Sequence, residues 1–510
     1  MKTLSTDVLI IGSGFGGAAP ALRFSKAGFK TTVIEKGPDI NPYTSFRQTQ
    51  DPKYLLKYFR NVTATRLNLQ FIEALGGGSG FYEMISLRAP SLVFDIKNDK
   101  GINEWPEKLS RRFFDKYYDK AETALNVEQA GEHEIPKTGH VFIKLMKQCN
   151  YSVERTRYAL TNCQNSGYCI SGCVYGAKQS LFMNYLPEAK KFGATIYTEM
   201  DAFAIKPIRV SMAENDSFPY RYWVLCKDKR SKNELIYYKT KILILGAGTI
   251  GTAKLLLSSK ENLPNLSKEV GKNISFNGSV KAIALLPDSY PDADMYSGRS
   301  HPGLVSYHFL KKEHLMLTAA KVLPIQLVSG ARFDTSMLGY PAWGKDYIQL
   351  IKQFRHRMII LAALGIEPTK GSMTVNDIGK INLHLNVNKE LENHYHRTYK
   401  MLETVFKKTG CTSMPFEYVN RKGKVSHSPF FTSSHQLGSC RMSTSKENGV
   451  INDAGEVFNY PGMYIADGSA IPSSTIVNPS LTILANSERI ADQLLLKYQK
   501  FSKKLLSVNS

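Results

Sequence analysis

The first forty residues alternate between apolar runs and glycine-rich breaks. Val8–Ile11 is an apolar run long enough for a buried parallel strand. Apolar residues between 18 and 27 then recur at helical spacing, and Gly28 supplies a stop signal. A second apolar run, Thr31–Ile34, ends on Glu35. The pattern predicts strand, turn, helix and strand, the βαβ unit of an α/β fold.

The glycines between the first strand and the helix predict a phosphate-binding turn. Gly12, Gly14 and Gly16 follow GxGxxG-like spacing, with Phe15 between them and Gly17 after them. Such glycines allow a tight turn and a close approach of backbone to a pyrophosphate, and the helix N-terminus faces the phosphate charge. An acid about twenty residues later accepts hydrogen bonds from a ribose, and Glu35 has that place. The stretch therefore predicts a dinucleotide site.

Two later glycine clusters accompany this unit. Gly77, Gly78 and Ser79 lie in a dense cluster at 75–80, which favours backbone held against a flat ligand over a flexible loop. Lys241–Leu257 repeats strand, glycine turn at Gly246 and helix, but no second strand with a terminal acid follows. We therefore expect this strand to return to the first sheet, with its turn near the same dinucleotide, and we expect no nicotinamide site.

The hydrophobic pattern changes between residues 277 and 427. Apolar and polar residues alternate there in segments such as SVKAIALLP and KINLHLNVN, which predicts antiparallel strands, and a long helix is predicted at 391–408. Further helices are predicted at 105–126 and 184–193. We predict a dinucleotide-binding domain over residues 1–276 that is completed by residues 428–510. A second domain, over residues 277–427, is predicted to be built on a mainly antiparallel sheet and to bind substrate. The fold class is α/β, or α+β overall.

Composition limits the function classes. The 510 residues carry 43% hydrophobic and 22% charged residues, the balance of an ordinary globular protein. The net charge of +22 is spread over scattered lysines and arginines without a nucleic-acid motif, so we expect no nucleic-acid partner and at most weak contact with an anionic membrane surface. The N-terminus leads directly into the first strand, which predicts a cytoplasmic protein, free or peripheral to the membrane. Cys163, Cys169 and Cys173 lack CxxC spacing and predict a structural turn without metal.

The C-terminal part carries the candidate chemistry. His435 and Gly438 lie in SHQLGSCRM, and an apolar strand follows that ends at Asp467 and Gly468. Asn478-Pro479 then opens an amphipathic helix, with Asn478 predicted as its N-cap. That helix directs its positive end toward whatever precedes it.

Taken together, these segments resemble the glucose–methanol–choline (GMC) oxidoreductases. The resemblance covers nearly the whole chain in the family's order, and the cholesterol oxidase branch is the most similar. Its motifs are the opening fingerprint, the GGGS loop, GCVYGAKQS, NYLPEAKKFGA, the GAG turn, HQLGSCRM and ADGSAIP…NPSLTI. Two departures stand out: Tyr82 lies where the branch carries small residues near the flavin, and Glu367 is the nearest candidate for the second acid or base of some sterol oxidases.

The resemblance implies FAD, a Rossmann-like FAD-binding domain assembled from several segments, and oxidation of an alcohol such as a sterol or another hydrophobic alcohol. It implies that His435 helps to remove the hydroxyl proton and that Asn478 lies beside flavin and substrate. The electron acceptor would be oxygen, a quinone or a carrier protein. The alternatives are a non-catalytic flavin-binding or membrane-surface protein, and a flavin reductase or monooxygenase that uses NAD(P)H.

Overall fold

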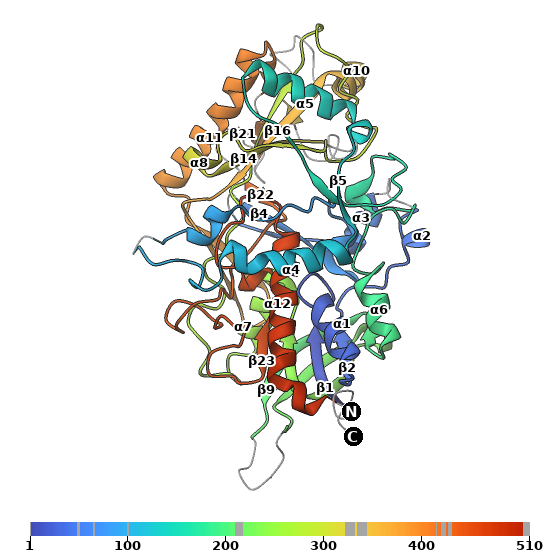
Figure 1. The fold of residues 1–510 in the computed structure, drawn as a ribbon, viewed down its shortest axis with the longest axis vertical. Helices are drawn as coiled ribbons and strands as arrows, with labels where there is room; N and C mark the ends of the chain where they lie inside the picture. Colours follow the sequence, from blue (N-terminus) through green and yellow to red (C-terminus); the bar gives the residue numbers. More distant parts are fainter. Residues whose placement is uncertain are drawn as a thin grey trace.

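The computed structural model describes residues 2–47, 52–64, 67–98, 101–209, 218–321, 332–333, 344–414, 416–419, 425–426 and 431–502. Two sheets dominate the fold and lie toward opposite ends of its long axis (Figure 1). The mixed fold confirms the predicted class.

The first sheet has seven strands in the order β8-β2-β1-β11-β10-β9, with β23 also paired to β11. Its parallel strands are β8 (Thr195–Tyr197), β2 (Thr31–Ile34), β1 (Lys2–Ile11), β11 (Glu234–Leu245) and β23 (Met463–Ile465). The strands β10 (Tyr222–Asp228) and β9 (Met200–Pro207) extend it antiparallel. The predicted return of Lys241–Leu257 to this sheet is confirmed, because β11 pairs with β1 in parallel from Lys2↔Ile236 to Ile11↔Leu245.

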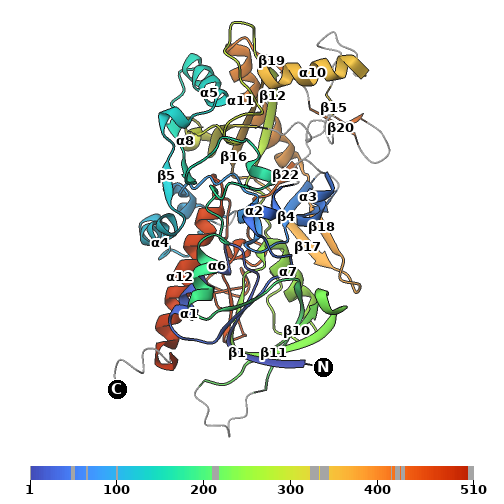
Figure 2. The same ribbon diagram turned by 90° about the vertical axis from the view of Figure 1, so that its right-hand side faces the viewer.

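Helices cover both faces of this sheet. Figure 2 shows α1 (Ala18–Lys26), α6 (Tyr185–Lys191) and α12 (Ser480–Tyr498) on one side and α7 (Gly248–Ser258) on the other. The apolar face of α1 packs on the fully buried end of β1, as the opening pattern predicted.

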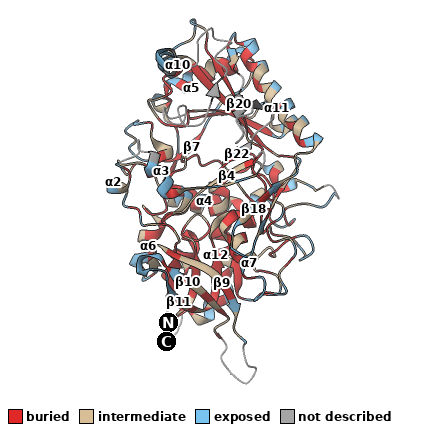
Figure 3. Cartoon of the chain, turned by 180° about the vertical axis from the view of Figure 1, so that it is seen from behind, coloured by how far each residue is buried: buried red, intermediate tan, exposed pale blue. Residues whose placement is uncertain are grey.

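The second sheet has six antiparallel strands, which confirms its predicted character. Their order is β19 (Thr412–Met414), β12 (Val280–Leu285), β16 (Met358–Gly365), β14 (Leu315–Ala320), β13 (Leu304–Ser306) and β6 (Glu154–Arg155). One face packs on α5 (Lys137–Gln148) and α11 (Lys389–Lys408) through a core of its own. Buried residues run through both sheets, while exposed ones gather on the outer faces of helices such as α5 and α11 (Figure 3).

Smaller elements lie between and around the two sheets. The helices are α2 (Pro42–Ser45), α3 (Pro52–Tyr58), α8 (Leu310–Glu313) and α10 (Gly344–Arg357). Two small sheets have three strands each: β3 (Phe59–Thr63), β4 (Leu67–Ile72) and β22 (Phe431–Ser433) form one, and β15 (Arg332–Phe333), β20 (Phe416–Val419) and β21 (Val425–Ser426) form the other. Two further strand pairs are β5 (Val127–Gln129) with β7 (Arg157–Ala159), and β17 (Gly371–Val375) with β18 (Ile381–Leu385).

One helix prediction needs a correction. The helix predicted from Trp105 begins only at Arg111, as α4 (Arg111–Ala124), because the Ser110 side chain caps it at the Phe113 amide. Trp105 precedes that cap and is buried, and its indole N–H donates to Ser473 at 2.9 Å.

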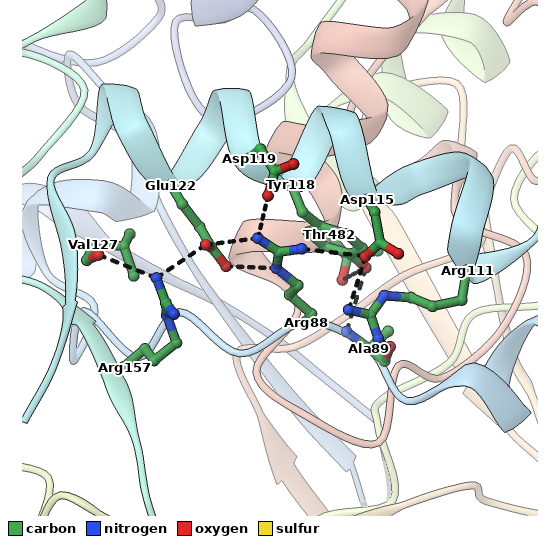
Figure 4. Close-up of polar contacts among 10 residues, drawn as sticks. All are labelled: Arg88, Ala89, Arg111, Asp115, Tyr118, Asp119, Glu122, Val127, Arg157 and Thr482. Carbon is green, nitrogen blue, oxygen red and sulfur yellow. Dashed lines mark hydrogen bonds and ion pairs between the residues drawn. The ribbon is translucent and has the colours of Figure 1, made fainter.

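A polar network joins α4 to its surroundings (Figure 4). The Arg88 guanidinium donates to both carboxylate oxygens of Glu122 at 2.8 Å and also contacts Asp115 and Asp119. Arg157 of β7 reaches the same Glu122 carboxylate at 3.1 Å. On the next turn of α4, the Tyr118 hydroxyl lies 2.9 Å from the hydroxyl of Thr482 in α12. The network therefore fixes α4 against the first turn of α12.

Candidate active site

A cavity of about 1940 Å³ runs from the glycine turns of the first sheet to the inner face of the second. Its volume exceeds the range of about 300–1,000 Å³ that single ligands occupy. With the exception of Ser79, every residue predicted for the site lines it: Gly12, Gly14, Phe15, Gly16, Glu35, Gly77, Gly78, Gly246, His435, Asp467, Gly468, Asn478 and Pro479. Ser79 is buried behind the wall, where its hydroxyl donates to the Gly76 carbonyl and accepts from the Leu181 amide.

The glycines divide into two groups by what a side chain would meet. A Cβ atom on Gly12 would lie 2.4 Å from the Gly246 carbonyl oxygen, and one on Gly16 would lie 2.4 Å from the Asp467 Cβ, so these positions need glycine for packing. A Cβ on Gly14 would meet only the Gly77 Cα, at 3.7 Å. Gly14 therefore borders open cavity, where backbone can approach a ligand, whereas a Cβ on Gly77 would lie 3.0 Å from the Gly14 Cα.

Glu35 stands at the end of β2, as predicted, and is buried. Its carboxylate accepts from the Ser13 hydroxyl at 2.6 Å, from the Ser13 amide at 3.0 Å and from the Gly37 amide at 2.8 Å. Burial raises its pKa against the effect of these donors. These bonds hold the acid at the cavity wall, and its contact with a ribose stays a prediction.

Asp467 joins the two glycine-turn regions. One carboxylate oxygen accepts from the Gly248 amide at 2.8 Å and the Thr252 hydroxyl at 2.5 Å, both in α7, and the other accepts from Ser469. The acid therefore fixes the N-terminus of α7 beside the turn that follows β23. Gly246 and the first turn of α7 line the same cavity as the first glycine turn, as predicted.

His435 lies on the cavity wall between two asparagine amides. The Asn277 Nδ2 is 3.5 Å from its Nδ1, and the Asn478 Nδ2 is 3.4 Å from its Nε2. Burial, together with the smaller effect of the Lys281 charge, lowers the pKa of His435 to about 4. The imidazole is therefore neutral at pH 7 and retains one nitrogen that can accept a proton.

The Asn277 side chain is held by the segment that leads into α12. Its oxygen accepts from the Ser474 hydroxyl at 2.5 Å and the Ile476 amide at 3.1 Å, while its nitrogen donates to the Val477 carbonyl at 2.9 Å. Sequence reasoning missed this residue, because an Asn-Gly pair between two segments is typical of a turn.

The predicted N-cap at Asn478 is wrong. Pro479 occupies the cap position of α12, no side chain caps the helix, and the Asn478 amide turns toward His435 instead. The cavity still lies at the positive end of the helix, since both Asn478 and Pro479 line it.

The other candidates lie differently. Glu367 is buried beside Lys370 and does not line the cavity, so it is not placed to act as a base. Tyr82 does line it, with its ring against Phe15 and its hydroxyl donating to the Gln179 carbonyl at 3.1 Å.

The cysteine-containing turn is tied to the GGGS loop through Lys178. Its buried ammonium donates to the carbonyls of Gly80, Tyr82 and Cys169. This assigns the lysine of GCVYGAKQS a structural role. Within the described ranges, His, Cys, Asp and Glu form no cluster of three or more that could hold a metal ion. The absence of metal at Cys163, Cys169 and Cys173 stays a prediction. No helix of the described residues combines the length and apolar character that crossing a bilayer requires.

Comparisons with known proteins agree with this geometry. Residues 7–277 match the sequence model of the N-terminal part of GMC oxidoreductases, and residues 369–487 match that of the C-terminal part. The chain is 24% identical to a cholesterol oxidase of Acinetobacter baumannii, over 95% of this chain and 93% of that protein. It is also 24% identical to a long-chain-alcohol oxidase of Arabidopsis thaliana, over 96% of this chain and 67% of that protein. The structure of formate oxidase from Aspergillus oryzae RIB40 superposes with a TM-score of 0.68 over 98% of this chain and 100% of that one, at 13% identity.

Proposed function

The chain belongs to the GMC oxidoreductase family, and from this premise we propose that it oxidises the CH–OH group of an alcohol with FAD, while His435 accepts the hydroxyl proton. The family makes it an FAD-binding flavoenzyme that acts on alcohols. The single observation that carries the proton transfer is a neutral imidazole held on the wall of the cavity between two amides.

The residues that would hold FAD fit such a group. A Cβ on Gly14 would meet only the Gly77 Cα at 3.7 Å, and a Cβ on Gly78 would meet no atom within 4 Å, so backbone at both positions is open to the cavity. The buried Glu35 carboxylate at the end of β2 suits a ribose, and the positive end of α12 suits an anionic ring edge. Bound FAD supplies the acceptor for the hydride that leaves the alcohol carbon.

His435 acts on the substrate hydroxyl in this proposal. As the proton passes to the imidazole, the adjacent carbon loses its hydride more readily. Asn478 lies beside the ring on the Nε2 side and Asn277 on the Nδ1 side. Because a neutral imidazole has one donor and one acceptor nitrogen, only one of these two amide N–H groups can donate to it, and the substrate hydroxyl takes the place of that donor when the proton is transferred. Positioned acid–base groups typically contribute about 10²–10⁴-fold in rate.

The names of the relatives support a hydrophobic alcohol as substrate and oxygen as electron acceptor, since the two similar sequences are a cholesterol oxidase and a long-chain-alcohol oxidase. Phe71, Ile360 and Leu364 give the cavity an apolar wall that suits such a substrate. Localisation in the cytoplasm stays a prediction.

The test is anaerobic reduction of the purified yellow protein by a panel of alcohols from sugars to sterols. We expect at least one alcohol to bleach the flavin, and peroxide to form when oxygen is admitted. Replacement of His435 by alanine should keep FAD and slow bleaching by about 10²–10⁴-fold. Bleaching by NADPH but by no alcohol would overturn the proposal in favour of a reductase.

A further inference from the structure

The end of the cavity remote from the glycine turns lies under the inner face of the six-stranded sheet. The strand register places Lys281 of β12 opposite Ala362 of β16, and Ala362 opposite Thr318 of β14. All three line the cavity. Because the middle residue is only an alanine, the space beside Lys281 stays open.

Lys281 directs a cation into this space. The Lys281 side chain is accessible to solvent and lines the cavity. The protein that surrounds it lowers its pKa, and the negative charge of Glu83 opposes this effect. The two facts fit one arrangement, in which the ammonium stands in the open volume of the cavity rather than on the outer surface. Across the part of the chain that the structure describes, the Lys281 ammonium has no hydrogen bond and no ion pair.

A second cation lines the same region. Lys321 is buried at the end of β14, where its ammonium donates to the Ser297 carbonyl. Glu83 also lines this region, with its own pKa raised by burial. Glu83 forms no ion pair with either lysine among the described residues. Two lysines therefore face one acid. Burial raises the pKa of Glu83 and lowers the pKa of both lysines, that of Lys321 to about 8, so that none of the three charges is fully compensated in the cavity.

His301 lines the cavity with these two lysines and Glu83, but it adds neither a positive charge nor a second base. The Thr318 hydroxyl donates to the Leu304 carbonyl at 2.9 Å and therefore accepts from the His301 Nε2, 2.7 Å away. The His301 Nδ1 then accepts from the Tyr158 hydroxyl at 3.1 Å and the Gly303 amide at 3.2 Å. Burial lowers the pKa of His301 to about 3, which agrees with a neutral ring whose two nitrogens are both in use.

A neutral, wholly apolar substrate would fill this end of the cavity at a cost, because it would remove water from Lys281 without a counter-charge. We propose that the substrate alcohol carries a carboxylate, which binds at Lys281 and Lys321, while its apolar part lies along Phe71 and Leu364. This inference rests on the proposed function, since it names the class of alcohol that reaches His435. The cations would also disfavour uncharged alcohols, which gives specificity as well as affinity.

The experiment compares matched pairs of substrates on the FAD-loaded enzyme. Each hydroxy acid is tested against its methyl ester, with the hydroxyl either next to the carboxylate or at the far end of the chain. Hydrogen bonds to charged groups correspond to about 10- to 100-fold in affinity, so we expect the acid to exceed its ester in kcat/KM by at least that range. Lys281→Met should bring the ratio of acid to ester close to one, and Lys281→Arg should retain most of it. Lys321→Met should lower the ratio in part.

The matched control is Lys311→Met, which removes the same charge from an exposed position on α8 and should leave the ratio unchanged. A binding titration gives a second readout that needs no turnover. Benzoate should shift the flavin absorption spectrum at concentrations about 10- to 100-fold lower than benzamide, and Lys281→Met should remove that difference.

The outcomes separate this inference from the proposed function. If neutral alcohols reduce the flavin as well as the matched acids, and benzoate binds no better than benzamide, the carboxylate site is refuted while alcohol oxidation stands. If benzoate binds through Lys281 but no alcohol bleaches the flavin, the anion site stands and the proposed reaction fails. An unchanged ratio in Lys281→Met would also refute the assignment of the site.

Discussion

The protonation state of His435 gives a prediction that depends directly on its surroundings. With a pKa of about 4 instead of the ordinary 6.5, the imidazole stays neutral far into the acid range. At pH 5.5 about 97% of the protein would carry the base form, against about 9% for an unperturbed histidine. Protonation removes the base, so the rate of flavin reduction must fall as pH drops, and it should reach half its plateau only near pH 4.

The assay is anaerobic stopped-flow reduction of the bound flavin by a neutral alcohol between pH 4 and pH 8, analysed as kcat/KM. Lys281→Met removes one of the two causes of the lowered pKa, so its acid limb should move upward toward pH 6.5. His435→Gln still offers a hydrogen bond but no base, and should lose both the limb and about 10²–10⁴-fold in rate. A wild-type limb at pH 6.5 would contradict the burial argument. A His435→Ala variant that reduces at the wild-type rate would show that another group takes the proton.

Three further predictions concern the scaffold. Gly14→Val should fold normally yet purify without FAD, whereas Gly16→Ala should lose thermal stability, because its Cβ would overlap protein atoms and not cavity; full occupancy in the first variant would contradict the assignment. Arg88→Met should lower the free energy of unfolding by about 2–3 kcal/mol in urea titrations, below the range for a fully buried pair, because Arg157 still reaches Glu122. The pKa of His301 is about 3 in the folded state and about 6.5 in the unfolded chain, so protonation favours unfolding. The contribution of His301 to the free energy of unfolding should be fully present above pH 6.5 and should fall by about 1.4 kcal/mol per pH unit toward pH 3. The His301→Gln variant should show a flatter dependence of stability on pH.

The opening unit could be predicted from the sequence because its signals are local. Within Val8–Glu35 the apolar runs, the glycines and the terminal acid each constrain a neighbour a few residues away, and the strand β2 has the predicted bounds. The same holds for the strand, turn and helix around Gly246, where the missing acid correctly indicated a strand of the first sheet.

The rest of the site depends on contacts that no local pattern carries. Asn277 is held by Ser474, Ile476 and Val477, about two hundred residues later, so its sequence neighbours indicated only a turn. Lys281 occupies a polar position in an alternating strand, which is typical of a solvated face. In the folded protein this face of the strand borders the cavity and not bulk solvent, so Lys281 becomes a candidate binding residue. Asn478 suited a helix cap by residue type, but its amide contacts His435, which lies on another segment.

The order of strands in the first sheet has a consequence for how the protein is made. The strand β11 lies between β1, from the start of the chain, and β23, which the ribosome adds more than two hundred residues after β11. Until β23 emerges, one edge of β11 is unpaired at Leu243–Leu245, and His435 and Asn478 are not yet both present. Such long-range pairing is slow and leaves unfinished edges open to other chains. We therefore expect nascent protein to be most prone to aggregation in the interval before β23 pairs with β11.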